Sequence, residues 1–185
     1  MRVKRFTFSK LFKLLLVLII IFAGYQIVVR PRLSQSQPVA EKPLPAKLAK
    51  AITEINKSFE FEAFIVKEEG TEEVTFTIAS AELKDQIKVK GEPRGVNKDE
   101  QFLLLRLEIE NETTENLAIV SSNLVRLVDE EDKKHAPDFH NATIIIDPLS
   151  VRKDLLSFIV EENKKSFKLL VGELEEEKET VEINF

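Results

Sequence analysis

The feature that most constrains the fold is a run of alternating side chains over residues 102–111. Its apolar members fall on one face of an extended chain and its charged members on the other: Leu103, Leu105, Leu107 and Ile109 against Arg106, Glu108 and Glu110. A period of two with charged alternates is typical of a strand that has one face in a core and the other in water. The sequence therefore predicts an antiparallel sheet with one solvated face.

Shorter patterns of the same kind predict more strands, separated by turn residues such as Gly70 and the segment 91–95 (GEPRG). We expect strands at residues 59–66, 74–83, 87–89, 117–120, 124–128, 143–146, 155–160, 167–171 and 181–185. About ten strands without long helices favour an all-β domain over residues 59–185, built as two packed antiparallel sheets. The chain has no cysteine, so its core must stabilise it without disulfides.

Residues 101–111 (QFLLLRLEIEN) resemble the "kfvvVxvxVxN" strand of telokin-like, immunoglobulin-type domains of unknown function on bacterial surface lipoproteins. Segments 125–129 (VRLVD) with 132–134 (DKK), 147–150 (DPLS), and 155–158 (LLSF) with 167–169 (FKL) look like that family's later hairpin, turn and strand pair, in the same order. Asp132 or Lys133 replaces the hairpin glycine, and Leu149 replaces the turn glycine. The resemblance implies an immunoglobulin-like antiparallel β-sandwich outside the membrane, without an established enzymatic activity.

The N-terminal region predicts a membrane anchor. Sixteen uncharged residues run from Leu14 to Val29, and Leu11 and Phe12 extend them to the length of a bilayer span. Five basic residues and no acid precede the span, which favours a cytoplasmic N-terminus and an extracytoplasmic C-terminal domain. We therefore expect a cytoplasmic tail over residues 1–10 and a transmembrane signal anchor over 11–30, with membrane contact from Leu11 to Val29.

A cleaved signal peptide is the alternative, because a basic start and an apolar segment are common to both. Cleavage after Ala23 would place Ile21, and cleavage after Gly24 would place Phe22, where signal peptidase prefers a small residue. Retention as an anchor is the favoured interpretation. Tyr25 stands where a lipoprotein signal carries its lipidated cysteine, so a lipid anchor is excluded there.

Residues 31–45 contain four prolines together with serine and glutamine, which is typical of a semi-stiff spacer. Residues 46–58 follow, where Leu48, Ala51, Ile52 and Ile55 recur at spacings of three and four. This spacing predicts a short amphipathic helix. The helix could pack on the domain, lie on the membrane surface, fray as part of the spacer, or drive oligomerisation.

Charge and motifs limit the possible functions. The first thirty residues carry six Lys or Arg and no acid, so the rest has a net charge of −11 against −5 for the whole chain. An acidic domain repels phosphate backbones, so we expect no nucleic-acid partner. The chain lacks a Gly-x-Ser-x-Gly elbow and a glycine-rich phosphate loop, and it has only two histidines. We expect no enzymatic activity and no cofactor.

One turn-rich stretch gathers residues that could bind a metal ion: Asp129, Asp132, His135, Asp138 and His140. Carboxylates suit calcium, and histidines with a carboxylate suit zinc. The stretch has no glycine at a sharp turn, and its spacing favours a solvated acidic hairpin over a metal site. The favoured function is thus an envelope module that binds or scaffolds another protein of unknown identity. The alternative is a metal or ligand sensor that uses residues 129–140.

Overall fold

The computed structural model describes residues 49–173 and 177–185. The chain divides into two compact units, Met1–Ala46 and Lys47–Phe185, and every described residue belongs to the second. The predicted anchor at 11–30 and the spacer at 31–45 lie outside the described residues. Within the described part, no helix combines the length and apolar character needed to cross a membrane.

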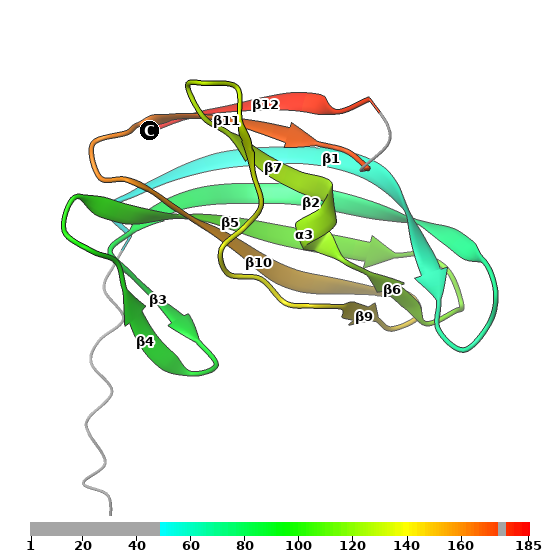
Figure 1. Cartoon of the computed structure of the whole chain (residues 1–185). Coiled ribbons are helices and arrows are strands. Elements are labelled where there is room, and N and C mark those ends of the chain that lie inside the picture. Colours follow the sequence, from blue (N-terminus) through cyan, green and yellow to red (C-terminus); the bar gives the residue numbers. More distant parts are fainter. Residues whose placement is uncertain (1–48, 174–176) are drawn as a thin grey trace, which may run out of the picture. The chain divides into compact units, whose positions relative to one another are not determined.

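The described part is an all-β antiparallel sandwich of two main sheets (Figure 1). The larger sheet has the strand order β10-β5-β2-β1-β6-β9, and its members are β10 (Ser150–Glu161), β5 (Glu100–Asn111), β2 (Thr71–Lys84), β1 (Ala51–Ile65), β6 (Leu117–Ile119) and β9 (Ile144–Ile146). The smaller sheet has the order β12-β11-β7-β8, with β12 (Glu179–Asn184), β11 (Ser166–Val171), β7 (Val125–Val128) and β8 (Lys134–His135). A separate hairpin joins β3 (Gln86–Val89) to β4 (Glu92–Gly95), and one short helix, α3 (Ser121–Leu124), precedes β7.

The core lies between the two sheets, where the alternation in the sequence predicts it. The larger sheet contributes the almost fully buried apolar side chains of β5, which are Leu103, Leu105, Leu107 and Ile109. The smaller sheet contributes buried side chains of β11 and β12 to the same cluster, namely Phe167, Leu169, Val181 and Ile183. The predicted all-β sandwich, with one face of each sheet in a common core, is confirmed.

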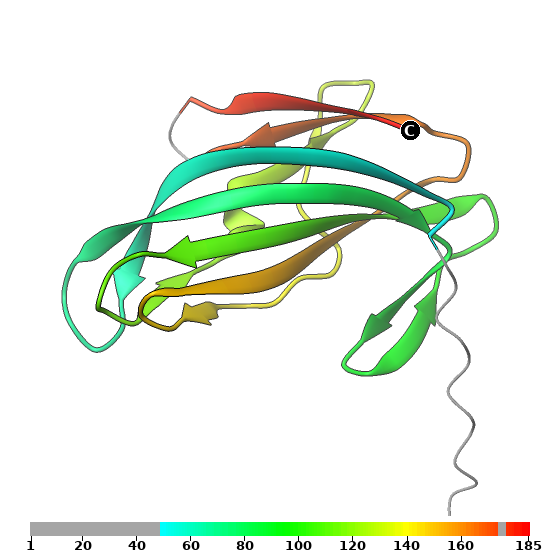
Figure 2. The same cartoon turned by 180° about the vertical axis from the view of Figure 1, so that it is seen from behind.

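A second, smaller cluster lies on the outer face of the larger sheet. Ile87 of the β3–β4 hairpin packs against Phe102 and Leu104, which point away from the main core. Phe139 packs edge-on against Phe102, with ring centroids 5.9 Å apart. The hairpin therefore covers one end of the outer face, and Figure 2 shows it projecting from that end while the rest of the face is bare.

Glu82 is a buried carboxylate on the same outer face. It forms ion pairs with Lys84 (2.6 Å) and with Arg106 across the strand pair β2–β5. Burial acts to raise the pKa of Glu82, but the hydrogen bonds and charges of Arg106 and Lys84 outweigh it, so the pKa lies below its ordinary value. Glu82 is therefore held as a charged, paired group.

The predicted helix at residues 46–58 is wrong. From Ala51 onward this segment is the first half of β1, paired with β2 from Ala51↔Leu83 to Lys57↔Ile78 with a bulge after Glu54. Pairing with β2 satisfies the backbone hydrogen-bonding groups of this segment, whereas an isolated helix of this length is only marginally stable. Ile52, Thr53 and Ile55 are β-branched, which also favours a strand. The sandwich consequently begins before residue 59.

Candidate functional site

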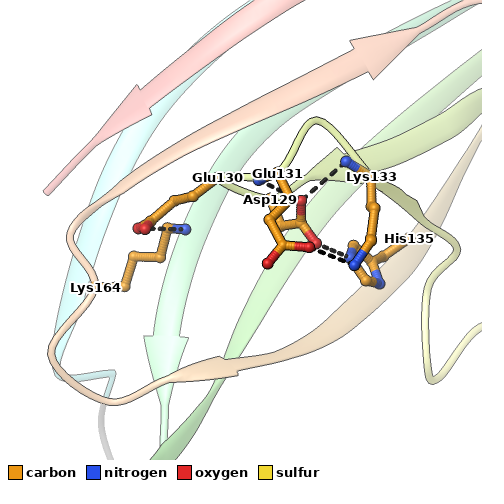
Figure 3. Close-up of polar contacts among 6 residues, drawn as sticks. All are labelled: Asp129, Glu130, Glu131, Lys133, His135 and Lys164. Carbon is orange, nitrogen blue, oxygen red and sulfur yellow. Dashed lines mark hydrogen bonds and ion pairs between the residues drawn. The ribbon is translucent and has the colours of Figure 1, made fainter.

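Residues 129–135 of the acidic stretch form the turn and second strand of the β7–β8 hairpin, residues 136–140 belong to the loop that follows, and Asp129 organises the turn (Figure 3). Asp129 Oδ1 accepts hydrogen bonds from the backbone N–H groups of Glu131 and Lys133, both at 2.9 Å. Its Oδ2 lies 2.7 Å from His135 Nε2. The hydrogen bond with His135 and those from the two N–H groups lower the pKa of Asp129 to about 2.

The other candidate ligands lie apart from this pair or have local partners. Asp138 Oδ2 accepts the backbone N–H of Ile159 at 2.7 Å, and His140 Nδ1 lies 2.8 Å from the carbonyl oxygen of Asn141. Asp132 adopts a left-handed conformation with φ = 58° at the turn. In residues 49–173 and 177–185 no three acidic or histidine side chains are arranged to hold a metal ion. The contacts of the stretch connect the turn to itself, to Lys164 in the turn after β10, to β10 through Asp138 and to β5 through Phe139.

A different feature stands out on β10, which is an edge strand of the larger sheet. Ser157 exchanges backbone hydrogen bonds with the loop before β9: its N–H donates to the carbonyl of Phe139 (2.9 Å), and its carbonyl accepts from the N–H groups of Asp138 (2.9 Å) and Phe139 (3.2 Å). With the bond from Ile159 to Asp138, this loop covers the C-terminal half of the β10 edge. The N-terminal half is not covered in this way.

Backbone groups along a strand point alternately to its two sides. Those of Val151, Lys153 and Leu155 therefore point to the same side as those of Ser157, away from β5. Among the described residues, none of these N–H and C=O groups has a hydrogen-bond partner. Residues 151–155 thus form an open strand edge.

A groove of ≈ 410 Å³ lies along this open edge. One wall is the segment 141–147, which includes β9, and the other is residues 152–154 of β10. The turn 147–149 joins β9 to β10, but the two strands do not pair with each other. They diverge from the turn, so the groove occupies the gap between the two edges of the larger sheet.

Two buried polar side chains fix the walls of the groove. The Asp154 carboxylate accepts hydrogen bonds from Ser121 Oγ (2.5 Å) and Asn141 Nδ2 (2.6 Å), so it ties β10 to α3 and to the loop before β9. At the other end, Asn111 Nδ2 donates to the carbonyl oxygens of Ile146 (3.3 Å) and Asp147 (3.1 Å). The gap is therefore held by specific contacts on both sides.

Exposed apolar side chains occur on the two strands and the turn that flank the groove, and one of them, Ile145, lines it. Four of the seven large apolar side chains that are exposed in the described residues lie between positions 145 and 155: Ile145 (45%), Leu149 (71%), Val151 (51%) and Leu155 (43%). Phe64 (67%) extends this set, because Phe64, Ala118 and Ile145 are cross-strand neighbours on β1, β6 and β9. Such grouping on a surface indicates an interaction site.

Sequence reasoning missed this site, although a signal for it exists. Residues 155–160 (LLSFIV) are apolar at nearly every position, whereas a strand with one solvated face alternates. The inward residues Leu156, Phe158 and Val160 fill the core, and Leu155 and Ile159 are left on the outer face. The excess of apolar residues on an edge strand could have drawn attention to β10.

No protein-family model and no curated protein sequence matches this chain. Two solved structures are similar to it. A conserved hypothetical protein from Bacillus anthracis shares 19% identity with a TM-score of 0.48, and the match covers 74% of this chain and 99% of that one. An uncharacterised β-sandwich protein from Clostridium difficile 630 shares 15% identity with a TM-score of 0.42, over 70% of this chain and 97% of that one.

Proposed function

We propose that this chain is a membrane-anchored module of the cell envelope, and that its immunoglobulin-like sandwich binds another envelope protein on the extracytoplasmic side. The observation that carries the binding role is the group of exposed apolar side chains at Ile145, Leu149, Val151 and Leu155 beside the groove. Removing such side chains from water is the main favourable term in most protein association.

The anchor and its orientation rest on the sequence. The uncharged run from Leu14 to Val29 follows a basic start, and the acidic remainder would face the extracytoplasmic space. The immunoglobulin-like assignment is supported by two turns: Asp132 and Leu149, which replace glycines of the family pattern, have φ values of 58° and 50°. Positive φ is the conformation for which glycine is favoured.

Site-specific photo-crosslinking in cells tests the binding role. A photoreactive residue placed at Leu155 of the full-length chain should give a discrete crosslinked product with one envelope protein. The same residue at Lys168, which is exposed on β11 of the other sheet, serves as the matched control and should not give that product. Absence of any crosslinked protein from both Leu155 and Ile145 would contradict the binding role.

Protease protection tests the orientation separately. Protease added to intact cells with a permeabilised outer layer should degrade the sandwich and leave the N-terminal tail protected. Protection of the sandwich under these conditions would contradict the extracytoplasmic assignment.

A further inference from the structure

We propose that residues 151–155 of β10 bind an extended peptide segment as an added strand, and that this segment has the pattern apolar-x-acidic-x-apolar. The inference deepens the proposed function, since it names how the partner is held and by what chemistry. It rests on the unpaired backbone groups of Val151, Lys153 and Leu155 and on the groove beside them. Strand addition at such an edge uses backbone hydrogen bonds for affinity and alternate side chains for specificity.

The other strand edges of the two main sheets are short or covered in the described residues. β9 and β8 contain three and two residues. β12 lies beside β1, where Thr53 Oγ1 donates to the carbonyl of Asn184 (2.8 Å) and Lys57 forms an ion pair with Glu179 (2.5 Å). Short or covered edges are how proteins avoid unwanted strand pairing. The open half of β10 departs from this pattern.

The pattern of the added segment follows from the side chains of β10. Residues directly opposite each other on paired strands place their side chains on the same face. Val151 and Leu155 are exposed on the outer face, so the residues opposite them are apolar. Lys153 lies between them on the same face, where its side chain is 80% exposed and pairs with Glu108 of β5 (2.9 Å). An acidic residue opposite Lys153 on the added strand would extend this pairing across a third strand. The two intervening residues face the groove near Arg152 and Asp154 and are polar.

A partner peptide fits this edge better than a second copy of the chain. Antiparallel pairing of two β10 edges about Lys153 would set two lysines opposite each other, and like charges in that position are destabilising. The segment 141–147 forms the other wall of the groove beside this edge. Charge at Lys153 therefore favours a peptide over a second copy.

Binding of two synthetic peptides to the full-length chain, solubilised in detergent where required, tests the inference. The acetylated and amidated peptide GTVTETVTG carries the proposed pattern, and GTVTKTVTG reverses the central charge. Fluorescence anisotropy should show saturable binding of the first and weaker binding of the second. Residue-resolved hydrogen exchange should show new protection of the Val151, Lys153 and Leu155 amides, which binding through side chains alone would not produce.

Two variants separate strand addition from loss of folding. Lys153→Glu should lower the affinity for the acidic peptide about tenfold and raise the affinity for the lysine peptide by a similar factor. A folding defect cannot cause such a reciprocal change. Leu155→Pro removes an N–H that points away from β5, so the pairing of β10 with β5 should persist. The variant should lower the affinity for both peptides about fivefold, because the added strand loses one backbone hydrogen bond. Lys168→Glu, the same charge change on the other sheet, should alter neither affinity.

The possible failures are distinguishable. Peptide binding without protection of the three amides, or without the reciprocal effect of Lys153→Glu, overturns strand addition. If neither peptide binds saturably but Leu155 still gives a crosslinked product, strand addition is also overturned. The binding role then remains intact. Concentration-dependent dimers with protection of the same amides in the absence of peptide would show that a second copy takes the edge, which also overturns the inference.

Discussion

Asn111 provides the most direct test of how the groove is built. Its side chain is 1% exposed and lies at the end of β5. Nδ2 donates to the carbonyl of Glu115 (2.8 Å) and to those of Ile146 and Asp147, while Oδ1 accepts from the N–H (2.9 Å) and the hydroxyl (2.8 Å) of Thr113. Asn111→Ala removes all of these contacts and frees the start of the β9–β10 turn.

The loss of free energy of unfolding in Asn111→Ala can be estimated from the number of hydrogen bonds that the side chain makes. Two amide hydrogens are shared among three carbonyls, and two bonds are accepted, which gives about four effective hydrogen bonds. At about 1 kcal/mol each, Asn111→Ala should lower the free energy of unfolding by about 3 to 4 kcal/mol. Thr113→Val keeps the backbone bond to Asn111 but loses the two bonds of the hydroxyl, to Asn111 and from the exposed N–H of Glu115, so it should lower the free energy of unfolding by about 1 to 2 kcal/mol.

Asn111→Asp separates the donor role from the acceptor role. It keeps the oxygen that accepts from Thr113 but sets a second oxygen, with a buried charge, against the carbonyls of Ile146 and Asp147. It should therefore be at least as destabilising as Asn111→Ala. The chain has no tryptophan, so far-UV circular dichroism in urea is the suitable assay. With a slope of about 2 kcal/mol/M, the Ala variant should shift the midpoint by about 1.5 to 2 M. An Asn111→Asp midpoint close to that of the native chain would refute the donor role.

Three further predictions concern turns, charge and the domain boundary. Leu149→Gly should raise the free energy of unfolding by about 0.5 to 1 kcal/mol in the same assay, because φ = 50° strains a leucine that is largely exposed, and a decrease would contradict this. Since the folded pKa of Asp129 is about 2 and its ordinary value is 3.8, its contribution is present above pH 4 and is lost as the pH falls toward 2. Urea midpoints of Asp129→Asn should accordingly change less over this range than those of the native chain. A chain that begins at Lys47 should give a cooperative urea transition, whereas one that begins at Phe59 should not, because it lacks the first half of β1.

The strands were predictable because their alternation reflects burial directly. β5 has charged residues on one side at Arg106, Glu108 and Glu110, and the structure buries the other side. The segment 51–57 was not predictable in this way. Its partly buried residues alternate with exposed ones, but two of them, Thr53 and Lys57, are polar, and Ile52 is exposed, so the spacing of Ile52 and Ile55 imitates a helix. Only the tertiary pairing with β2 decides between the two structures.

The turn of the β7–β8 hairpin was predictable, whereas the groove was not predictable as a site. The density of polar residues marks the hairpin, but hydrogen bonds such as those of Asp129 depend on local geometry that composition does not contain. The open edge depends on which strand lies at the border of the sheet and on which half of it a loop covers. The partner of Ser157 is Phe139, eighteen positions away, and no local pattern encodes that pairing.

Buried polar contacts fix the two strands that flank the groove, although the sheet does not close on itself there. β9 and β10 are joined by the turn at 147–149, and two strands so connected would ordinarily pair as a hairpin. Asn111 holds the carbonyls of Ile146 and Asp147 on the side of β5, and Asp154 holds Asn141. These buried polar groups fix where β10 and the segment before β9 lie, while the backbone of β10 at residues 151–155 stays unpaired on the side away from β5. The open edge is thus fixed by the same side chains that stabilise the fold, and loss of Asn111 should disturb stability and peptide binding together.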